Sequence, residues 1–123
     1  MESKNYQALA MRTNDGKCTD RLQDACTAKF TDVGGIVNAS LGLSGEVGEL
    51  NDSIKKAIFH GHDIDTYAVK KEIGDILWYV ALMCHSFGFD MGEIMEINIA
   101  KLKARYPDGF SEYLSQHRQE GDK

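Results

Sequence analysis

The chain has 123 residues, of which 42% are hydrophobic and 27% are charged. This composition excludes a disordered chain, and the length predicts that residues 1–123 form a single domain. The formal net charge of −5 provides no basic face for a DNA or RNA backbone, so a nucleic acid polymer is not an expected partner. The longest apolar run, Ile76–Cys84, is too short to span a membrane, and the N-terminus lacks a signal-peptide pattern. We therefore expect no membrane contact and a cytoplasmic location.

Helical patterns cover most of the chain. The single proline and the lack of alternating β-branched runs argue against a β-sandwich or barrel. A weak helix is predicted over Asn5–Thr13, a second short helix over Asp20–Lys29, and a long helix over Asp32–His60. The first half of the long helix contains several glycines, each of which costs about 0.5–1 kcal/mol relative to alanine. Burial or the geometry of a site must offset that cost.

The next helix follows the long one after a short polar connection, Phe59–Asp65, in which Asp63 or Asp65 can serve as the N-cap. It runs to about Phe87, where Gly88 is placed to terminate it. Because the connection is short, we expect the two helices to pack antiparallel as a hairpin.

A third main helix opens at Asp90-Met91-Gly92-Glu93, which has the pattern of a capping box. It ends before Pro107, because the residue that precedes a proline disfavours the α region. Phe110–His117 is expected to add one or two helical turns. The predicted fold class is all-α, with an antiparallel helix hairpin and additional helices.

One five-residue pattern occurs twice, at Glu46–Leu50 and at Glu72–Ile76: an acid, a β-branched residue, a glycine, an acid and an aliphatic residue. At 100° per residue, each acid pair lies along one edge of an apolar stripe. An antiparallel hairpin with facing stripes brings the two acid pairs towards each other. The stripes are Leu43, Val47, Leu50, Ile54 and Ile58 in one helix and Val69, Ile73, Ile76, Leu77, Val80 and Cys84 in the other, and the converging acids are Glu46, Glu49, Glu72 and Asp75.

Four converging carboxylates repel one another at neutral pH unless protons or cations compensate their charge. Mg²⁺, with Mn²⁺ as an alternative, is the expected counter-charge, because hard cations prefer carboxylate and water oxygens and commonly bind through acids and substrate phosphates. A pair of such ions can activate a water and clamp a phosphoryl group, which suggests metal-assisted phosphate chemistry. The competing interpretation is a solvated face, since amphipathic helices commonly carry such acids.

Candidate donor groups lie on the third main helix, where Asn98, Lys101 and Arg105 fall close to one face. One amide and two cations in a line suit an extended polyphosphate or a base-plus-phosphate ligand. Alternatively, the two cations offset the helix dipole near its C-terminus. Lys56, in the long helix, is either a solvated charge or a phosphate contact.

Two aromatic residues and two histidines lie near the acid pairs in the sequence. Tyr79 follows Asp75 by four residues and therefore lies on the acid edge, which makes it a candidate for substrate binding. Trp78 is more typical of core or subunit-interface packing. His60 and His62 flank a glycine, and without a nearby cysteine this is a weak zinc pattern that is more typical of a polar loop.

These stretches resemble the MazG-like nucleoside triphosphate pyrophosphohydrolases of the all-α NTP pyrophosphatase superfamily. The family motif is E-x-x-E, a spacer and E-x-x-D, and the spacer here is Leu50–Lys71. The resemblance covers most of the chain, with no clear match between Cys18 and Val37. The matching stretches are Leu41–Leu50, Phe59–His62, Lys71–Tyr79, Asn98–Leu102 and Arg105–Phe110, together with the Tyr6 and Arg12-Thr13 positions.

The resemblance implies Mg²⁺-dependent hydrolysis of a nucleoside or deoxynucleoside triphosphate between the α and β phosphates, yielding a monophosphate and pyrophosphate. The four acids match the metal-binding positions of the motif, and Glu49 is a candidate for the group that orients or deprotonates the attacking water. The expected catalytic and metal-binding residues are Glu46, Glu49, Glu72 and Asp75, and the expected substrate-binding residues are Asn98, Lys101, Arg105, Tyr79 and Lys56.

An oligomer is also expected, because a hairpin and one further helix cannot easily close a core around the apolar stripe and Trp78. The family similarly builds its four-helix core from two subunits and often pairs dimers into tetramers. The resemblance therefore implies a homodimer or homotetramer in which oligomerisation completes a four-helix bundle.

Two other classes of protein compete with an enzyme. A helical protein of the di-iron bundle kind needs Glu-x-x-His pairs, and none of the histidines has a glutamate three residues before it. A non-catalytic nucleotide- or metal-binding module with the same fold would bind its ligand without turnover.

Overall fold

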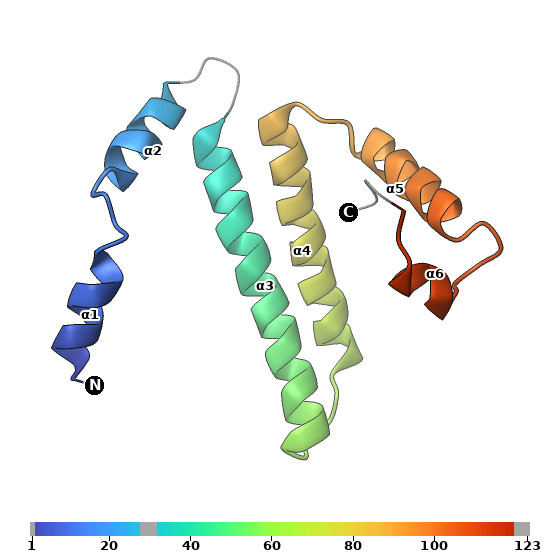
Figure 1. The fold of residues 1–123 in the computed structure, drawn as a ribbon. Helices are drawn as coiled ribbons and strands as arrows, with labels where there is room; N and C mark the ends of the chain where they lie inside the picture. The colour runs from blue at the N-terminus through green and yellow to red at the C-terminus, as the bar shows by residue number, and fades with distance from the viewer. Residues whose placement is uncertain (1, 28–31, 120–123) are drawn as a thin grey trace.

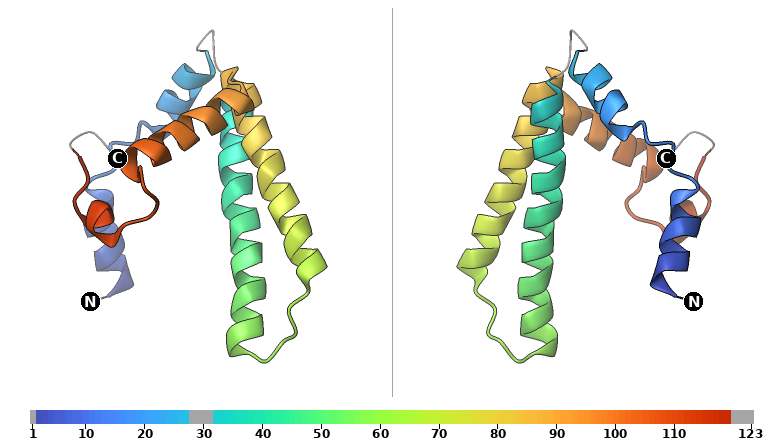
Figure 2. Two further views of the ribbon diagram at one scale, coloured as in Figure 1. Left: turned by 90° about the vertical axis from the view of Figure 1, so that its right-hand side faces the viewer. Right: turned by 90° about the vertical axis from the view of Figure 1, so that its left-hand side faces the viewer.

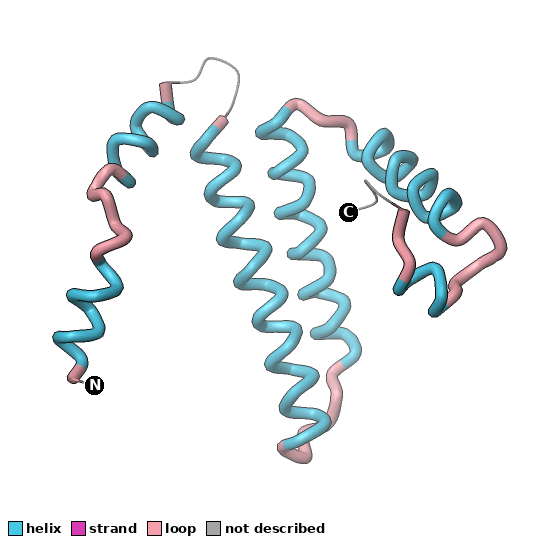
Figure 3. The backbone as a smooth tube through the Cα atoms, viewed as in Figure 1, coloured by secondary structure: helices cyan, strands magenta, loops and turns pink. Residues whose placement is uncertain are grey.

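The computed structural model describes residues 2–27 and 32–119, which form α-helices and no strand. Helices α3 and α4 lie side by side and run in opposite directions, as Figures 1 and 2 show from different sides. The remaining helices branch away from the end of this pair at which α3 begins and α4 ends, and Figure 3 shows the loops that join them. The prediction of an all-α fold is confirmed. The helices are α1 (Ser3–Met11), α2 (Cys18–Cys26), α3 (Val33–Phe59), α4 (Thr66–Phe87), α5 (Met91–Arg105) and α6 (Glu112–Gln116).

The two central helices begin and end at signals that the sequence carries. Asp32 caps α3, and its carboxylate accepts a hydrogen bond from the backbone N–H of Gly35 at 3.0 Å. Of the two candidate caps for α4, the structure uses Asp65, which accepts from two backbone N–H groups of the first turn. Gly88 follows the end of α4 with a φ of 72°, a left-handed conformation that glycine adopts without steric cost.

The outer helices agree with their predicted bounds only in part. Asp90 caps α5 by accepting from the backbone N–H of Glu93 at 3.0 Å, and α5 ends before Pro107 as expected. Helices α1 and α2 each begin two residues earlier than predicted. The predicted end of the second helix at Lys29 lies outside the described residues.

A polar contact joins the start of α3 to the end of α4. The buried Ser86 hydroxyl donates a hydrogen bond to the Asp32 carboxylate at 3.1 Å, and the Asp32 backbone N–H donates to the Ser86 carbonyl at 3.4 Å. A Cβ at Gly35 would overlap both side chains. The same aspartate therefore caps one helix and fixes the other against it.

The central pair of helices buries little apolar surface in a single chain. Ala39 is fully buried and Cys84 nearly so, and no large side chain among the described residues is fully buried. Each apolar stripe is covered over only about half of its width, because one neighbouring helix cannot reach the whole stripe. The half-buried members include Leu43, Leu50, Ile76 and Val80, and the exposed members are Val47, Ile54, Ile58, Ile73 and Leu77.

The exposed apolar residues and the acids lie on opposite edges of the contact between α3 and α4. At 100° per residue, the acids of each helix fall to one side of the residues that face the neighbour, and the exposed apolar residues fall to the other. Because the helices are antiparallel, corresponding edges meet on the same side of the pair. We call Glu46, Glu49, Glu72 and Asp75 the acidic face, and Val47, Ile54, Ile58, Ile73 and Leu77 the apolar face.

Candidate active site

Three of the four predicted acids come together between α3 and α4. Glu46, Glu72 and Asp75 each offer a carboxylate oxygen, and these oxygens all lie within 4.8 Å of one another. Glu46 and Glu72 are half-buried, whereas Asp75 is exposed. Oxygen ligands on opposite sides of Mg²⁺ lie about 4 Å apart, so a small adjustment would let the three acids share one ion. The donor chemistry suits a hard divalent cation.

The charges in this cluster act most strongly on Glu46. Its pKa is raised above the ordinary value of 4.5, first by its partial burial and then by the negative charges of Glu49, Asp75 and Glu72. A hydrogen bond with Glu72 also favours the protonated form of Glu46. A cation bound among these carboxylates would relieve the repulsion that raises this pKa.

Glu49 lies close to the cluster but is not one of the converging acids. It is exposed and follows Glu46 by three residues on the acidic face, near enough for its charge to act on the Glu46 carboxyl. This position lets Glu49 contact a molecule that is bound at the cluster without having to share the same ion.

The predicted donors on α5 are not beside the acids within one chain. Helix α5 leans away from α3 and α4 in both views of Figure 2 and makes few contacts with either. Asn98 and Lys101 are exposed on this helix, and Arg105 is half-buried near its end. A role for these three residues in the same site therefore requires either a different position of α5 or a second copy of the chain.

Lys56, a predicted substrate-binding residue, forms an ion pair on α3. Its Nζ atom lies 2.6 Å from the Asp52 carboxylate, and the Nζ atom of Lys55 lies 2.8 Å from the same group. Hydrogen bonds from Lys55 and Lys56 lower the pKa of Asp52 to about 2. The spacings of three and four residues from Asp52 to the lysines would have predicted these pairs.

Tyr79 lies against α3 one turn beyond the acids. Its ring occupies the space that a side chain at Gly42 would fill, and it meets Trp78 edge to face with ring centroids 5.0 Å apart. Trp78 keeps 58% of its surface exposed. The sequence signal for this contact is one of spacing: Gly42 precedes Glu46 by the same four residues by which Tyr79 follows Asp75.

The glycines inside the two pentapeptides have a different environment. Apart from the adjacent residues and the local helix backbone, no atom of the described residues lies within 4 Å of the position that a Cβ would take at Gly48 or Gly74. Among the described residues, a new Cβ would come within 3.0 Å of another side chain at Gly42, at Gly35 and at Gly92, where the neighbour is the Asp90 carboxylate.

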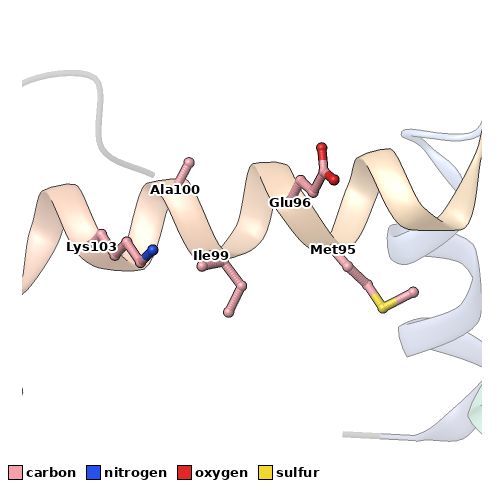
Figure 4. A pocket seen from close by; sticks show the side chains of 5 residues that line it. All are labelled: Met95, Glu96, Ile99, Ala100 and Lys103. Atoms are coloured by element: carbon pink, nitrogen blue, oxygen red, sulfur yellow. The ribbon is translucent and has the colours of Figure 1, made fainter.

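A separate hollow of about 400 Å³ lies along one face of α5, as Figure 4 shows. Its described lining residues belong to α5, and none of them lies on the helices that carry the acids. It therefore lies outside the carboxylate cluster. The lining residues are Met95, Glu96, Ile99, Ala100 and Lys103.

The loop after α3 carries the two histidines that form a weak zinc pattern in the sequence. His60 and His62 are both exposed in this loop, and neither belongs to the group of converging carboxylates.

Across residues 2–27 and 32–119, every helix is too short or too polar to cross a membrane.

Comparisons with known proteins match the part of the chain that carries the acids. The family model of the MazG nucleotide pyrophosphohydrolase domain matches residues 38–110, a range that includes both acid pairs. The Gene 37 protein of Mycobacterium phage L5 is 28% identical over 79 residues, which cover 61% of this chain and 69% of that protein. No solved structure matches the chain. Since the family match covers more than half of its residues, the chain belongs to the MazG nucleotide pyrophosphohydrolase domain family.

Proposed function

We propose that the protein hydrolyses a nucleoside or deoxynucleoside triphosphate between the α and β phosphates, with Mg²⁺ or Mn²⁺, and releases a monophosphate and pyrophosphate. The convergence of Glu46, Glu72 and Asp75 in a chain of the MazG family carries this proposal. Carboxylates placed this closely need a counter-charge, and a divalent ion with a bound polyphosphate supplies it. Because nucleoside triphosphates are cytoplasmic metabolites, we propose the same location for the protein.

The residues of the acidic face have distinct roles in this reaction. Glu46, Glu72 and Asp75 hold the metal, which when bound supplies Lewis acidity to the phosphates and to the attacking water. Glu49 lies outside the converging set, so its carboxylate is available to accept a proton from that water as a general base.

Substrate contacts extend from the acids along both central helices. Tyr79 lies one turn from Asp75, and Lys56 lies two turns from Glu49 on α3. Lys56 reaches a phosphate only if its ammonium group exchanges part of its contact with Asp52 for the ligand. The remaining proposed contacts are Asn98, Lys101 and Arg105 on α5.

We also propose that residues 1–123 form one domain whose core is completed in a homodimer or homotetramer. Leu77 keeps 55% of its surface exposed and Ile58 keeps 66%. Full burial of such side chains is worth about 1.5–3 kcal/mol each, and several exposed apolar side chains along one edge of a helix pair are typical of an interface. A second copy that covers the apolar face with its own would give a four-helix core and leave the acidic face open.

A panel of ribo- and deoxynucleoside triphosphates with Mg²⁺ or Mn²⁺, with products separated by chromatography, tests the reaction. We expect monophosphate and pyrophosphate. We further expect Glu49→Gln and Asp75→Asn to lower the rate by roughly 10²-fold or more, while Glu112→Gln, an exposed acid on α6, keeps the wild-type rate. Far-UV circular dichroism checks that each variant is folded.

Other products or unchanged variants would contradict the proposal. Diphosphate and phosphate would indicate a different bond, and pyrophosphate release at the wild-type rate by Glu49→Gln and Asp75→Asn would remove these acids from the mechanism. Thermal stabilisation by nucleotide and Mg²⁺ without pyrophosphate release would instead indicate a non-catalytic binding module.

A further inference from the structure

We propose that Gly42 is a positioning residue, whose missing side chain provides the space for the Tyr79 ring and so holds the Tyr79–Trp78 pair next to the carboxylates. The kinetic part of this inference rests on the function proposed above. Its structural part rests only on the packing of α3 against α4.

The register of the two helices brings Gly42 and Tyr79 together. Gly42 lies four residues before Glu46 on α3, and Tyr79 lies four residues after Asp75 on α4. Because the helices are antiparallel, both positions are displaced from the acids in the same direction, by about 6 Å along the helix axis. The ring and the glycine therefore meet one turn beyond the carboxylate cluster.

The contact involves a rigid part of Tyr79. A Cβ at position 42 would overlap Cδ1, Cε1 and Cζ of the ring. These atoms cannot move independently of one another, unlike the end of a flexible side chain. A side chain at position 42 would therefore either displace the whole ring or push α3 and α4 apart.

The Tyr79 ring, held in the space beside Gly42, positions Trp78 through their contact. Trp78 and Tyr79 meet at an interplanar angle of 90° with centroids 5.0 Å apart, an edge-to-face geometry that stabilises aromatic pairs. Tyr79 is half-buried and Trp78 is mostly exposed. The pair thus presents aromatic surface one turn from acids that would hold phosphates through a metal, at a place suited to the sugar or base of the same nucleotide.

Displacement of Tyr79 should weaken substrate binding more than it slows the chemical step. Trp78 and Tyr79 lie one helical turn from the acids that would hold the metal, and they are separate from that group. We therefore expect a change in KM with little change in kcat.

Gly48 provides a matched control in the same helix. Apart from its adjacent residues and the local helix backbone, nothing in residues 2–27 and 32–119 lies within 4 Å of its Cβ position, whereas Gly42 is covered by the Tyr79 ring. Alanine at either position favours the helix equally, so a difference between the two variants reports the contact with Tyr79.

The first experiment compares Gly42→Ala with Gly48→Ala by steady-state kinetics and near-UV circular dichroism, in which the single tryptophan reports its own environment. We expect Gly42→Ala to change the near-UV spectrum and to raise KM by roughly 2- to 10-fold, and Gly48→Ala to match the wild type in both. A wild-type spectrum and KM for Gly42→Ala would overturn the proposal.

A double-mutant cycle tests whether the effect passes through the ring. In the Tyr79→Ala background the ring is absent, so adding Gly42→Ala should raise KM no further. Effects that multiply in the double variant would overturn the proposal. If Gly42→Ala does not fold, the double variant should fold, and its failure while Tyr79→Ala folds would likewise overturn it.

These experiments distinguish a failure of this inference from a failure of the proposed function. A wild-type protein that hydrolyses no nucleoside triphosphate would refute the function, while the near-UV spectra would still decide the seating of Tyr79. If the wild-type protein is active and the Gly42→Ala variant has the wild-type spectrum and KM, only the positioning role of Gly42 is refuted.

Discussion

The acidic face and the apolar face lie on opposite sides of the same two helices, and each is incomplete in a different way. On the acidic face, the burial of Glu46 and the charges around it raise the pKa of its carboxyl. On the apolar face, Leu77 and Ile58 remain more than half exposed. In the described part of the chain, the first face gathers carboxylates whose charge bound cations would balance, whereas the second exposes apolar side chains that another protein surface would cover.

Under the proposed function, assembly and chemistry depend on different residues of the same two helices. Both faces share the buried contact between α3 and α4, but their residues do not overlap. A change on the apolar face should therefore act on assembly first, and a change on the acidic face should act on metal binding and its pH dependence.

The largest effect is expected from a charge on the apolar face. Leu77→Lys would place an ammonium group in the proposed interface and lose the burial of an aliphatic side chain, worth about 1.5–3 kcal/mol per subunit. We expect the oligomer to dissociate at micromolar concentration and the thermal stability to fall, as measured by light scattering after size exclusion and by calorimetry.

His85→Lys is the control for this prediction. His85 is also exposed on α4, but it lies on the side of that helix away from α3, so the same new charge should leave the oligomer intact. A wild-type protein that is already a monomer at this concentration, or a Leu77→Lys variant of unchanged mass, would show that the apolar face does not mediate assembly.

A smaller effect is expected from pH on the acidic face. The raised pKa of Glu46 means that its carboxyl binds a proton more tightly in the folded than in the unfolded protein. The metal-free protein should therefore lose stability as the pH rises from 4.5, the ordinary value for a glutamate, through the higher folded-state pKa. Mg²⁺ should reverse this loss, because it binds the deprotonated carboxylates.

Thermal melts across this pH range, with a chelator or with Mg²⁺, measure both effects. Glu46→Gln should flatten the metal-free profile. The low pKa values of Asp15 and Asp52 do not interfere, because each carboxyl titrates below its ordinary value of 3.8. A profile that is the same for Glu46→Gln and the wild type would contradict the assignment of this pH dependence to the acidic face.

The sequence was sufficient to predict the main helices, because their signals are local. Asp32, Gly88 and the residues before Pro107 act on backbone groups within a turn of themselves. The convergence of Glu46 with Glu72 and Asp75 depends only on helical periodicity and an antiparallel neighbour, and the structure brings these three together.

The remaining features depend on packing that periodicity does not specify. The meeting of Gly42 with Tyr79 requires the axial register of α3 against α4, and the choice of Asp65 over Asp63 as a cap requires the path of the loop. The position of α5 depends on tertiary contacts, which are few in one chain. The sequence could therefore place Asn98 and Lys101 on a helix but not beside the acids.

The smallest effect is expected at the two pentapeptide glycines, Gly48 and Gly74, which belong to neither face. Each lies about half a turn around its helix from the residues that contact the neighbour. Beyond the adjacent residues and the local backbone, the described part of the chain places no atom within 4 Å of either Cβ position. Because an interior glycine costs a helix about 0.5–1 kcal/mol relative to alanine, we expect Gly48→Ala and Gly74→Ala each to raise the free energy of unfolding by about that amount. Chemical denaturation measures this change, and activity should stay at the wild-type level. Destabilisation or lost activity would mean that a partner or substrate approaches this side of the helices in the assembled protein. The side that carries Gly48 and Gly74 would then be a third functional face.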